Sequence, residues 1–323
     1  MTDLKTSYLG LELKNPVIVG SCGLTNSVEN IKKLEENGAG AVVLKSIFEE
    51  QISMEIGSFD TGTLEHTEGY DYISEYTKQH NLNKYIKLIK ELKKEVSIPV
   101  IASINCITSG EWASFAETIQ SAGADALELN IFILPGDFKN KGENIERIYF
   151  DIIKNVEKKI SIPFSIKISS YFSGLANTIF NLSLTSVSGI VLFNRFYNPD
   201  IDIDKLEVVS AGIYSSQSEN AMPLRWIGIL SDHAKCDLVS STGVHNGKDV
   251  VKNILVGAKA VQVVTSIYKN GPEYIKTILN EIEEWMREHN YSTLNDFRGK
   301  LSRDKVKDPQ VFERVQFMKY FSS

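Results

Sequence analysis

The segment EWASFAETIQSAGADALELN, residues 111–130, carries a helix signal, a stop signal and a strand signal in that order. Its first part places charged and apolar residues at helical spacing, and Gly123 supplies the left-handed residue that commonly ends a helix. The apolar run at residues 125–130 then predicts a buried strand. Continuous apolar strands of this kind are expected in a parallel sheet that is covered on both faces.

Eight apolar runs of this type occur along the chain, and helical patterns separate most of them. The runs are residues 16–20, 41–45, 99–104, 125–130, 163–168, 189–194, 237–241 and 260–264. Eight such units in roughly 250 residues predict a TIM (β/α)8 barrel, with a doubly wound sheet as the alternative. We predict a single domain over residues 1–323. The alternating segment TSYLGLELKN, residues 6–15, predicts a small hairpin that closes the barrel floor.

Composition places the chain among globular proteins and excludes several function classes. Of its 323 residues, 42% are hydrophobic and 24% are charged, as in ordinary folded domains. A net charge of −6 argues against a nucleic-acid partner, which would need a basic surface. Cys22, Cys106 and Cys236 have neither disulfide-framework nor metal-ligand spacing, which argues against an intrinsic iron–sulfur centre. The absence of a signal peptide or apolar span predicts a cytoplasmic location and no membrane contact.

Three segments after predicted strands are unusual for connections. Residues 47–80 and 195–220 are long, and loops of this length in a compact domain are usually functional, so both are expected to rise over the catalytic face. Within the first, the run YDYISEY at residues 70–76 is predicted to be the core face of a helix. Residues 131–134, Ile-Phe-Ile-Leu, are apolar where a connection is normally polar, which suggests a wall or lid.

Polar residues gather at the predicted strand ends, where a TIM barrel builds its site. They are Ser21, Cys22, Lys45, Ser46, Asn105, Cys106, Asn130, Lys167, Asn194, Arg195, Thr242, Gly243, Thr265 and Ser266. Lys45 and Lys167 are embedded in apolar strands, so each needs an anionic partner or a lowered pKa. Pairing with Glu128 would satisfy this need, as would a side chain that reaches solvent.

Two further sets at the strand ends suit a planar, phosphorylated ligand. Asn130 and Asn194 each offer a donor and an acceptor, which fits the edge of a heterocycle, although an isolated asparagine can equally cap a turn. Gly243, Thr265 and Ser266 lie in the seventh and eighth loops, which form a phosphate cradle in many barrels.

At these residues the chain resembles the class 1 dihydroorotate dehydrogenases, which are FMN-dependent TIM barrels. NPVIVGSCGL is similar to the family's NPFMNASG, VVLKS to TKS, DALELN to ELNLSCPN, PFSIKISSYF to PLGVKLPPYF, LVSSTGVHNGKD to IIGTGGIETGQD, and STLNDFRGKL to SIADFHGKL. The matches keep the family's order over nearly the whole length.

The resemblance implies a flavin site and a small-molecule substrate, with no metal and a homodimeric assembly. FMN would be held by Ser21, Cys22, Lys45, Ser46, Asn130, Lys167, Asn194, Gly243, Val244, Thr265 and Ser266. Lys45 and Lys167 would be catalytic, with the charge of Lys167 near the N1 end of the ring favouring reduced anionic flavin. Asn105, Asn130, Asn194 and Arg195 would bind the substrate. The family glycines that match Thr242 and Val264 are absent, so the cradle should be slightly reshaped.

Departures from the family concentrate on the substrate side. Ile133 occupies the position of the family's catalytic cysteine, the general base, and the loop after Lys45 has no family match. Losing a general base costs about 10²–10⁴ in rate, so the natural substrate is expected to differ from dihydroorotate, with residues 131–134 facing a less polar molecule. Arg195 replaces a family serine. It could clamp a carboxylate or phosphate, or form a surface ion pair with Asp200 or Asp202. The candidate replacement bases are Cys106, His66, Tyr70 and Glu49.

We therefore predict an FMN-dependent oxidoreductase of the pyrimidine-biosynthesis family that acts on CH–CH groups. It would transfer hydride between FMN and a small planar or unsaturated substrate. Two alternatives remain open. One is a Schiff-base aldolase or lyase that uses Lys45 or Lys167 on a phosphorylated carbonyl compound. The other is a catalytically silent flavin-binding protein.

Overall fold

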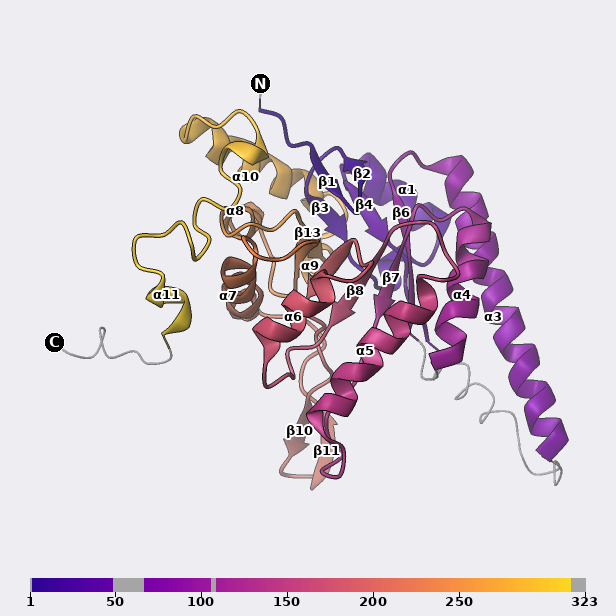
Figure 1. Ribbon diagram of the computed structural model, residues 1–323. Coiled ribbons are helices and arrows are strands. Elements are labelled where there is room, and N and C mark those ends of the chain that lie inside the picture. Colours follow the sequence, from indigo (N-terminus) through magenta and orange to yellow (C-terminus); the bar gives the residue numbers. More distant parts are fainter. Residues whose placement is uncertain (1, 49–66, 106–108, 315–323) are drawn as a thin grey trace.

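A closed parallel barrel forms the centre of the chain (Figure 1). The computed structural model describes residues 2–48, 67–105 and 109–314. The barrel strands are β3 (Val17–Val19), β4 (Ala41–Val43), β6 (Val100–Asn105), β7 (Ala126–Asn130), β8 (Phe164–Ile168), β9 (Gly189–Leu192), β12 (Asp237–Ser241) and β13 (Ala260–Val263). Neighbours pair in parallel, β13 returns to β3, and the β4–β6 pairing closes the ring. The TIM barrel prediction is confirmed, and the doubly wound alternative is excluded.

Helices surround the barrel and connect its strands (Figure 1). They are α1 (Val28–Glu36), α3 (Thr67–Glu95), α4 (Ser109–Ala122), α5 (Gly142–Val156), α6 (Leu175–Ser183), α7 (Ala221–Leu230), α8 (Gly247–Leu255), α9 (Thr265–Asn270), α10 (Tyr274–Glu288) and α11 (Gln310–Glu313). Short 3-10 turns are η1 (Gly23–Thr25), η3 (Gln217–Asn220) and η4 (Leu294–Asp296). Gly123 has φ +98°, which confirms its predicted role in ending a helix. Among the described residues no helix is both long and apolar enough to cross a membrane.

Strand side chains alternate between two apolar clusters because successive residues of a strand point to opposite faces. Val42, Leu127 and Val261 belong to the large cluster between barrel and helices, whereas Val43 and Ala126 belong to a smaller cluster inside the barrel. The same alternation continues toward the carboxyl ends of the strands. There it points polar side chains, such as that of Glu128, into the barrel interior.

An N-terminal hairpin of β1 (Thr6–Tyr8) and β2 (Leu11–Leu13) closes the barrel at the amino ends of its strands, as predicted. Tyr8 and Leu9 join the interior cluster, and the Leu9 N–H donates to an Asp237 carboxylate oxygen at 3.0 Å. A Cβ on Gly189 would lie 2.9 Å from the Tyr8 ring, so the close approach of the hairpin requires glycine there.

The two long segments contain more regular structure than their composition suggests. Strand β5 (Ile47–Phe48) pairs with β6, and helix α3 already begins at Thr67, so the predicted connection over residues 47–80 was wrong at Ile47–Phe48 and from Thr67 onward. The predicted helix at residues 70–76 is confirmed for the backbone. In the second segment, β10 (Pro199–Asp202) and β11 (Glu207–Ser210) form a hairpin that projects from the barrel end opposite β1 and β2 (Figure 1).

Candidate active site

A cavity of about 770 Å³ opens at the carboxyl ends of the barrel strands. Its lining includes Ser21, Cys22, Lys45, Ser46, Asn105, Trp112, Glu128, Asn130, Ile131, Phe132, Ile133, Leu134, Ile148, Ile152, Lys167, Asn194, Arg195, Ile213, Ser215, Ser241, Thr242, Gly243, Val244, Gln262, Val264 and Thr265. All the strand-end residues predicted to bind FMN or substrate line it except Ser266, whose buried Oγ has no hydrogen-bond partner in the described structure. The parallel barrel thus brings these distant residues together.

The buried side chains of Glu128 and Gln262 and the half-buried side chain of Lys167 form the floor of the cavity. Gln262 of β13 donates from Nε2 to Glu128 Oε2 at 2.6 Å and accepts from Lys167 Nζ at Oε1, at 2.8 Å. Burial lowers the pKa of the Lys167 ammonium and raises that of the Glu128 carboxyl, while their mutual attraction opposes both shifts. Glu128 is therefore the anionic partner predicted for Lys167. The two charged groups are connected by hydrogen bonds through the Gln262 amide.

Lys45 differs from Lys167 because its side chain is exposed at the cavity wall. The prediction that it is embedded was wrong: β4 ends at Val43, so Lys45 lies beyond the last strand residue and reaches solvent. Its neighbour Ser46 is buried in a hydroxyl chain in which Ser46 Oγ lies 3.1 Å from Ser21 Oγ and 2.7 Å from Ser103 Oγ. This chain fixes the ends of β3, β4 and β6 relative to one another.

The two predicted asparagines, Asn130 at the end of β7 and Asn194 just after β9, contact each other. Asn194 Nδ2 donates to Asn130 Oδ1 at 2.6 Å and lies 3.3 Å from the Lys167 carbonyl oxygen. This pairing leaves the Asn130 amide NH2 and the Asn194 carbonyl oxygen as the remaining side-chain groups for a ligand. Neither side chain is therefore only a turn cap.

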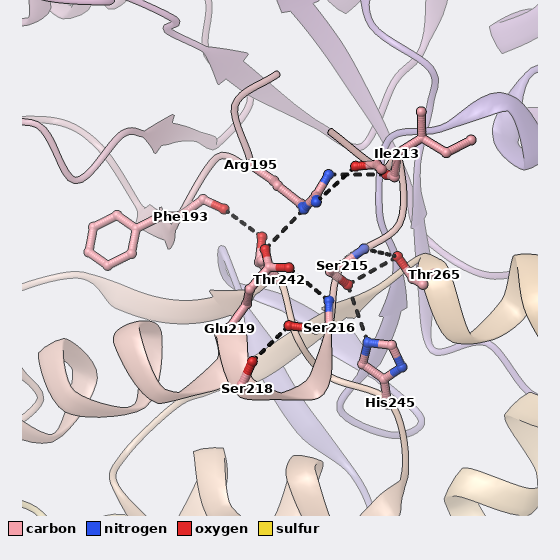
Figure 2. Close-up of polar contacts among 11 residues, drawn as sticks. Phe193, Arg195, Ile213, Ser215, Ser216, Ser218, Glu219, Thr242, His245 and Thr265 are labelled. Carbon is pink, nitrogen blue, oxygen red and sulfur yellow. Dashed lines mark hydrogen bonds and ion pairs between the residues drawn. The ribbon is translucent and has the colours of Figure 1, made fainter. Parts of the chain in front are cut away.

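The seventh loop keeps a glycine-like backbone at Thr242. This residue has φ +78° and the next, Gly243, has φ +74°, so Thr242 adopts a left-handed conformation that normally favours glycine. The Thr242 hydroxyl donates to the Phe193 carbonyl at 3.2 Å (Figure 2), which helps to offset the strain. A Cβ on Gly243 would lie 2.2 Å from the Asn220 backbone nitrogen, so glycine is required at the second position.

A polar cluster lies beside this loop (Figure 2). Ser215 Oγ donates to Thr265 Oγ1 at 3.0 Å and lies 3.3 Å from His245 Nε2. Ser215 and Thr265 line the cavity together with Gly243 and Val244. The Ser215 and Thr265 hydroxyls at the cavity wall are groups of the kind that can hydrogen-bond phosphate oxygens.

Arg195 is occupied by its own chain segment rather than pointing freely into the cavity (Figure 2). Its Nε pairs with Glu219 Oε2 at 2.9 Å, and its two terminal nitrogens donate to the carbonyl oxygens of Gly212 and Ile213, each at 3.1 Å. The ion pair predicted with Asp200 or Asp202 is wrong, because the loop after β11 returns Glu219 to the guanidinium instead. Arg195 thus connects Gly212 and Ile213, which follow β11, to Glu219 of η3.

One wall of the cavity, formed by the loop after β7, is apolar. Residues 131–134 all line it, and the three side chains of Trp112, Ile148 and Ile152 extend this wall onto α4 and α5. Ile133 is half-buried against the outer apolar cluster, and Phe132 packs on Phe196 at a ring distance of 4.1 Å. The described residues on this wall include no side chain that can accept a proton.

None of the four predicted candidates for the missing base is among the described side chains. Glu49, His66 and Cys106 lie outside the described residues, as does the Tyr70 side chain. Cys22 lines the cavity on the other side, and burial raises the pKa of its thiol. The described part of the chain also contains no group of three or more histidine, cysteine, aspartate or glutamate side chains that could hold a metal ion.

Sequence reasoning missed Gln262, Ser215 and Trp112. Gln262 sits at an inward position of β13, two residues after Ala260, so period-2 alternation could have found it. Ser215 and Trp112 reach the cavity from a long loop and from a helix start, where a single sequence carries no comparable signal.

The fold and cavity define a TIM barrel protein with an enzyme-like site at the carboxyl end of its strands. Residues 3–286 match the family model for dihydroorotate dehydrogenase, so the chain belongs to the dihydroorotate dehydrogenase family of oxidoreductases. The chain is 26% identical to the catalytic subunit of dihydroorotate dehydrogenase B (NAD(+)) from Thermoplasma volcanium, covering 93% of this chain and 98% of that protein. The same subunit of Methanocaldococcus jannaschii is 26% identical, over 92% and 97%. Dihydroorotate dehydrogenase A (fumarate) of Lactococcus lactis is 24% identical, over 92% and 99%.

Proposed function

We propose that this protein is an FMN-dependent oxidoreductase that transfers hydride between the flavin and a small planar or unsaturated substrate less polar than dihydroorotate. One observation carries the proposal: the cavity has a polar side built from the residues that match the family's flavin motifs, and an apolar side on which Ile133 stands in place of the family's base.

The described residues fit FMN in the kind of groups they offer. Asn130 and Asn194 present amide donors and acceptors for the edge of a flavin ring, and Lys167 places a cation at the floor. The Ser215 and Thr265 hydroxyls and the unpartnered Ser266 Oγ suit a phosphate. When bound, FMN would supply hydride-transfer chemistry.

The residues around such a ring would bind, orient and shield it. The Lys167 ammonium would stabilise negative charge that develops on the ring, because the buried floor strengthens electrostatic interactions. Ile131 and Ile133 would exclude water from the substrate face. The charge of Arg195 is largely engaged by Glu219, so we do not assign it the binding of a substrate anion.

The flavin proposal is tested by the absorption spectrum of the purified protein. We expect yellow protein with oxidised-flavin bands and release of stoichiometric FMN on denaturation. Apoprotein should regain the bands when FMN is added. Colourless protein that does not bind added FMN would contradict the proposal. Size-exclusion chromatography with light scattering tests the expected homodimer in the same sample.

A Schiff-base lyase is the second candidate, because burial lowers the pKa of the Lys167 ammonium and a neutral amine is the nucleophile in such enzymes. If Lys167 formed an imine, borohydride reduction in the presence of a phosphorylated aldehyde would trap a covalent adduct on Lys167. We expect an unmodified mass, since Lys167 is hydrogen-bonded to Gln262 at the floor.

A further inference from the structure

The Gln262 side chain spans the interior of the barrel between two charged groups. Gln262 lies on β13, whereas Glu128 and Lys167 lie on the neighbouring strands β7 and β8, and β12 and β9 separate β13 from them in the sheet. The amide donates to Glu128 at 2.6 Å and accepts from Lys167 at 2.8 Å. Both contacts are short, and Glu128 is fully buried.

The Glu128 carboxylate dictates which end of this amide faces Lys167. A carboxylate only accepts hydrogen bonds and an ammonium only donates, whereas an amide has one end of each kind. With Glu128 charged, the amide NH2 must face it, which turns the carbonyl oxygen toward Lys167. Without that charge, the amide could reverse and present its N–H groups to the ammonium.

We propose that Glu128 is a positioning residue that keeps Lys167 charged and aimed at the cavity floor, acting through Gln262. The resemblance described above implies ligand contacts for Asn130 and Lys167 and implies none for Glu128. The inference rests on the proposed function only for the identity of the ligand above Lys167.

The other groups near this pair do not replace Glu128. Tyr8 approaches Glu128 from the β1–β2 hairpin, and Tyr85 approaches it from α3. Burial raises the pKa of both phenols, so both stay neutral at pH 7. Cys22 faces Lys167 from the end of β3, and its thiol pKa is also raised by burial. Glu128 Oε1 and the nearby Ser165 Oγ have no hydrogen-bond partner in the described structure. Gln262 is therefore the hydrogen-bonded link from Glu128 to the floor.

The direct test measures the titration of Lys167 in protein without FMN. Lysine labelled with ¹³C at Cε gives one NMR signal per lysine, and the signal missing from Lys167→Met identifies Lys167. We expect Glu128→Gln to lower the measured pKa of Lys167 by about 1–3 units, a tenfold to thousandfold loss of proton affinity, because the ammonium loses the counter-charge of the buried carboxylate. An unchanged titration would overturn the proposal.

Two further variants control this measurement. Ser165→Ala changes the inward residue paired in register with Glu128 and should leave the Lys167 titration unchanged; an equal shift there would show a general packing effect and overturn the inference. Gln262→Met should lower the Lys167 pKa by less than Glu128→Gln, since the carboxylate remains. No shift in Gln262→Met would refute action through Gln262, and this variant also serves if Glu128→Gln does not fold.

A flavin readout separates this inference from the proposed function. Glu128→Gln should weaken FMN binding, and the loss should vanish in a Lys167→Met background, because both changes remove the same interaction. Additive losses would contradict the inference. If the wild-type protein binds no FMN, the proposed function fails, but the Lys167 titration still decides the role of Glu128.

Discussion

The two sides of the cavity follow the family to different degrees. On one side, Lys167, Asn130, Asn194 and Gly243 stand on the strands and loops that the family motifs predict, and hydrogen bonds connect the first three. On the other side, Ile133 stands where the family has its base. The difference teaches that this barrel keeps the strand-end residues of its family, whereas the loop after β7 presents a different, apolar face to the cavity.

The largest expected effect comes from restoring the base on the apolar side. Ile133→Cys should raise the rate at which dihydroorotate reduces the bound flavin by up to about 10²–10⁴-fold, the usual contribution of a general base. Stopped-flow absorbance under anaerobic conditions measures this rate. Leu134→Cys, one residue further along the same wall, is the matched control and should gain nothing. Equal rates in wild type and Ile133→Cys would show that the missing thiol does not limit the reaction.

On the polar side, Lys167→Met should weaken FMN binding by roughly 10- to 100-fold, because a charge-assisted interaction in a buried floor contributes about 1.5–3 kcal/mol. Lys45→Met should have a smaller effect, since Lys45 is exposed. Quenching of FMN fluorescence on binding measures both affinities. A larger loss for Lys45→Met would reverse the assignment of the floor cation.

Cys22 tests whether the polar side could supply a base instead. Burial raises the pKa of this thiol, so at pH 7–8 less thiolate is present than in free cysteine. Its alkylation by iodoacetamide should be at least several-fold slower than that of free cysteine and should rise about tenfold per pH unit below the raised pKa. The measurement uses a Cys106→Ser, Cys236→Ser background. Rapid alkylation at pH 7 would make Cys22 a candidate base.

The smallest expected effect concerns the backbone at Thr242, in the loop after β12. Thr242→Gly relieves a strained left-handed conformation worth about 1–2 kcal/mol but loses the hydroxyl bond to Phe193, so stability should change by less than about 1 kcal/mol. Leu206→Gly is the control, because exposed Leu206 also has positive φ, at +53°, and loses no such bond; it should stabilise the protein by up to about 1 kcal/mol. Urea unfolding measures both. A loss of several kcal/mol in Thr242→Gly would show that the hydroxyl anchors the loop.

Much of the fold could be predicted from the sequence because each strand is a short apolar run and several helices end at a glycine such as Gly123. The shared position of the candidate site residues around one cavity followed from the fold, since parallel strands bring their carboxyl ends together. The start of α3 at Thr67 and the partner of Arg195 could not be predicted, because neither follows from local periodicity. The Glu128–Gln262–Lys167 contact depends on barrel register, which brings together residues 134 positions apart.

The measurement that tests the account most directly is the anaerobic absorption spectrum of the flavin-loaded wild-type protein after addition of excess dihydroorotate. We predict that the oxidised-flavin band persists or bleaches slowly, while Ile133→Cys bleaches faster under the same conditions. Rapid bleaching of the wild-type protein would contradict the claim that the substrate side has changed while the flavin side is retained.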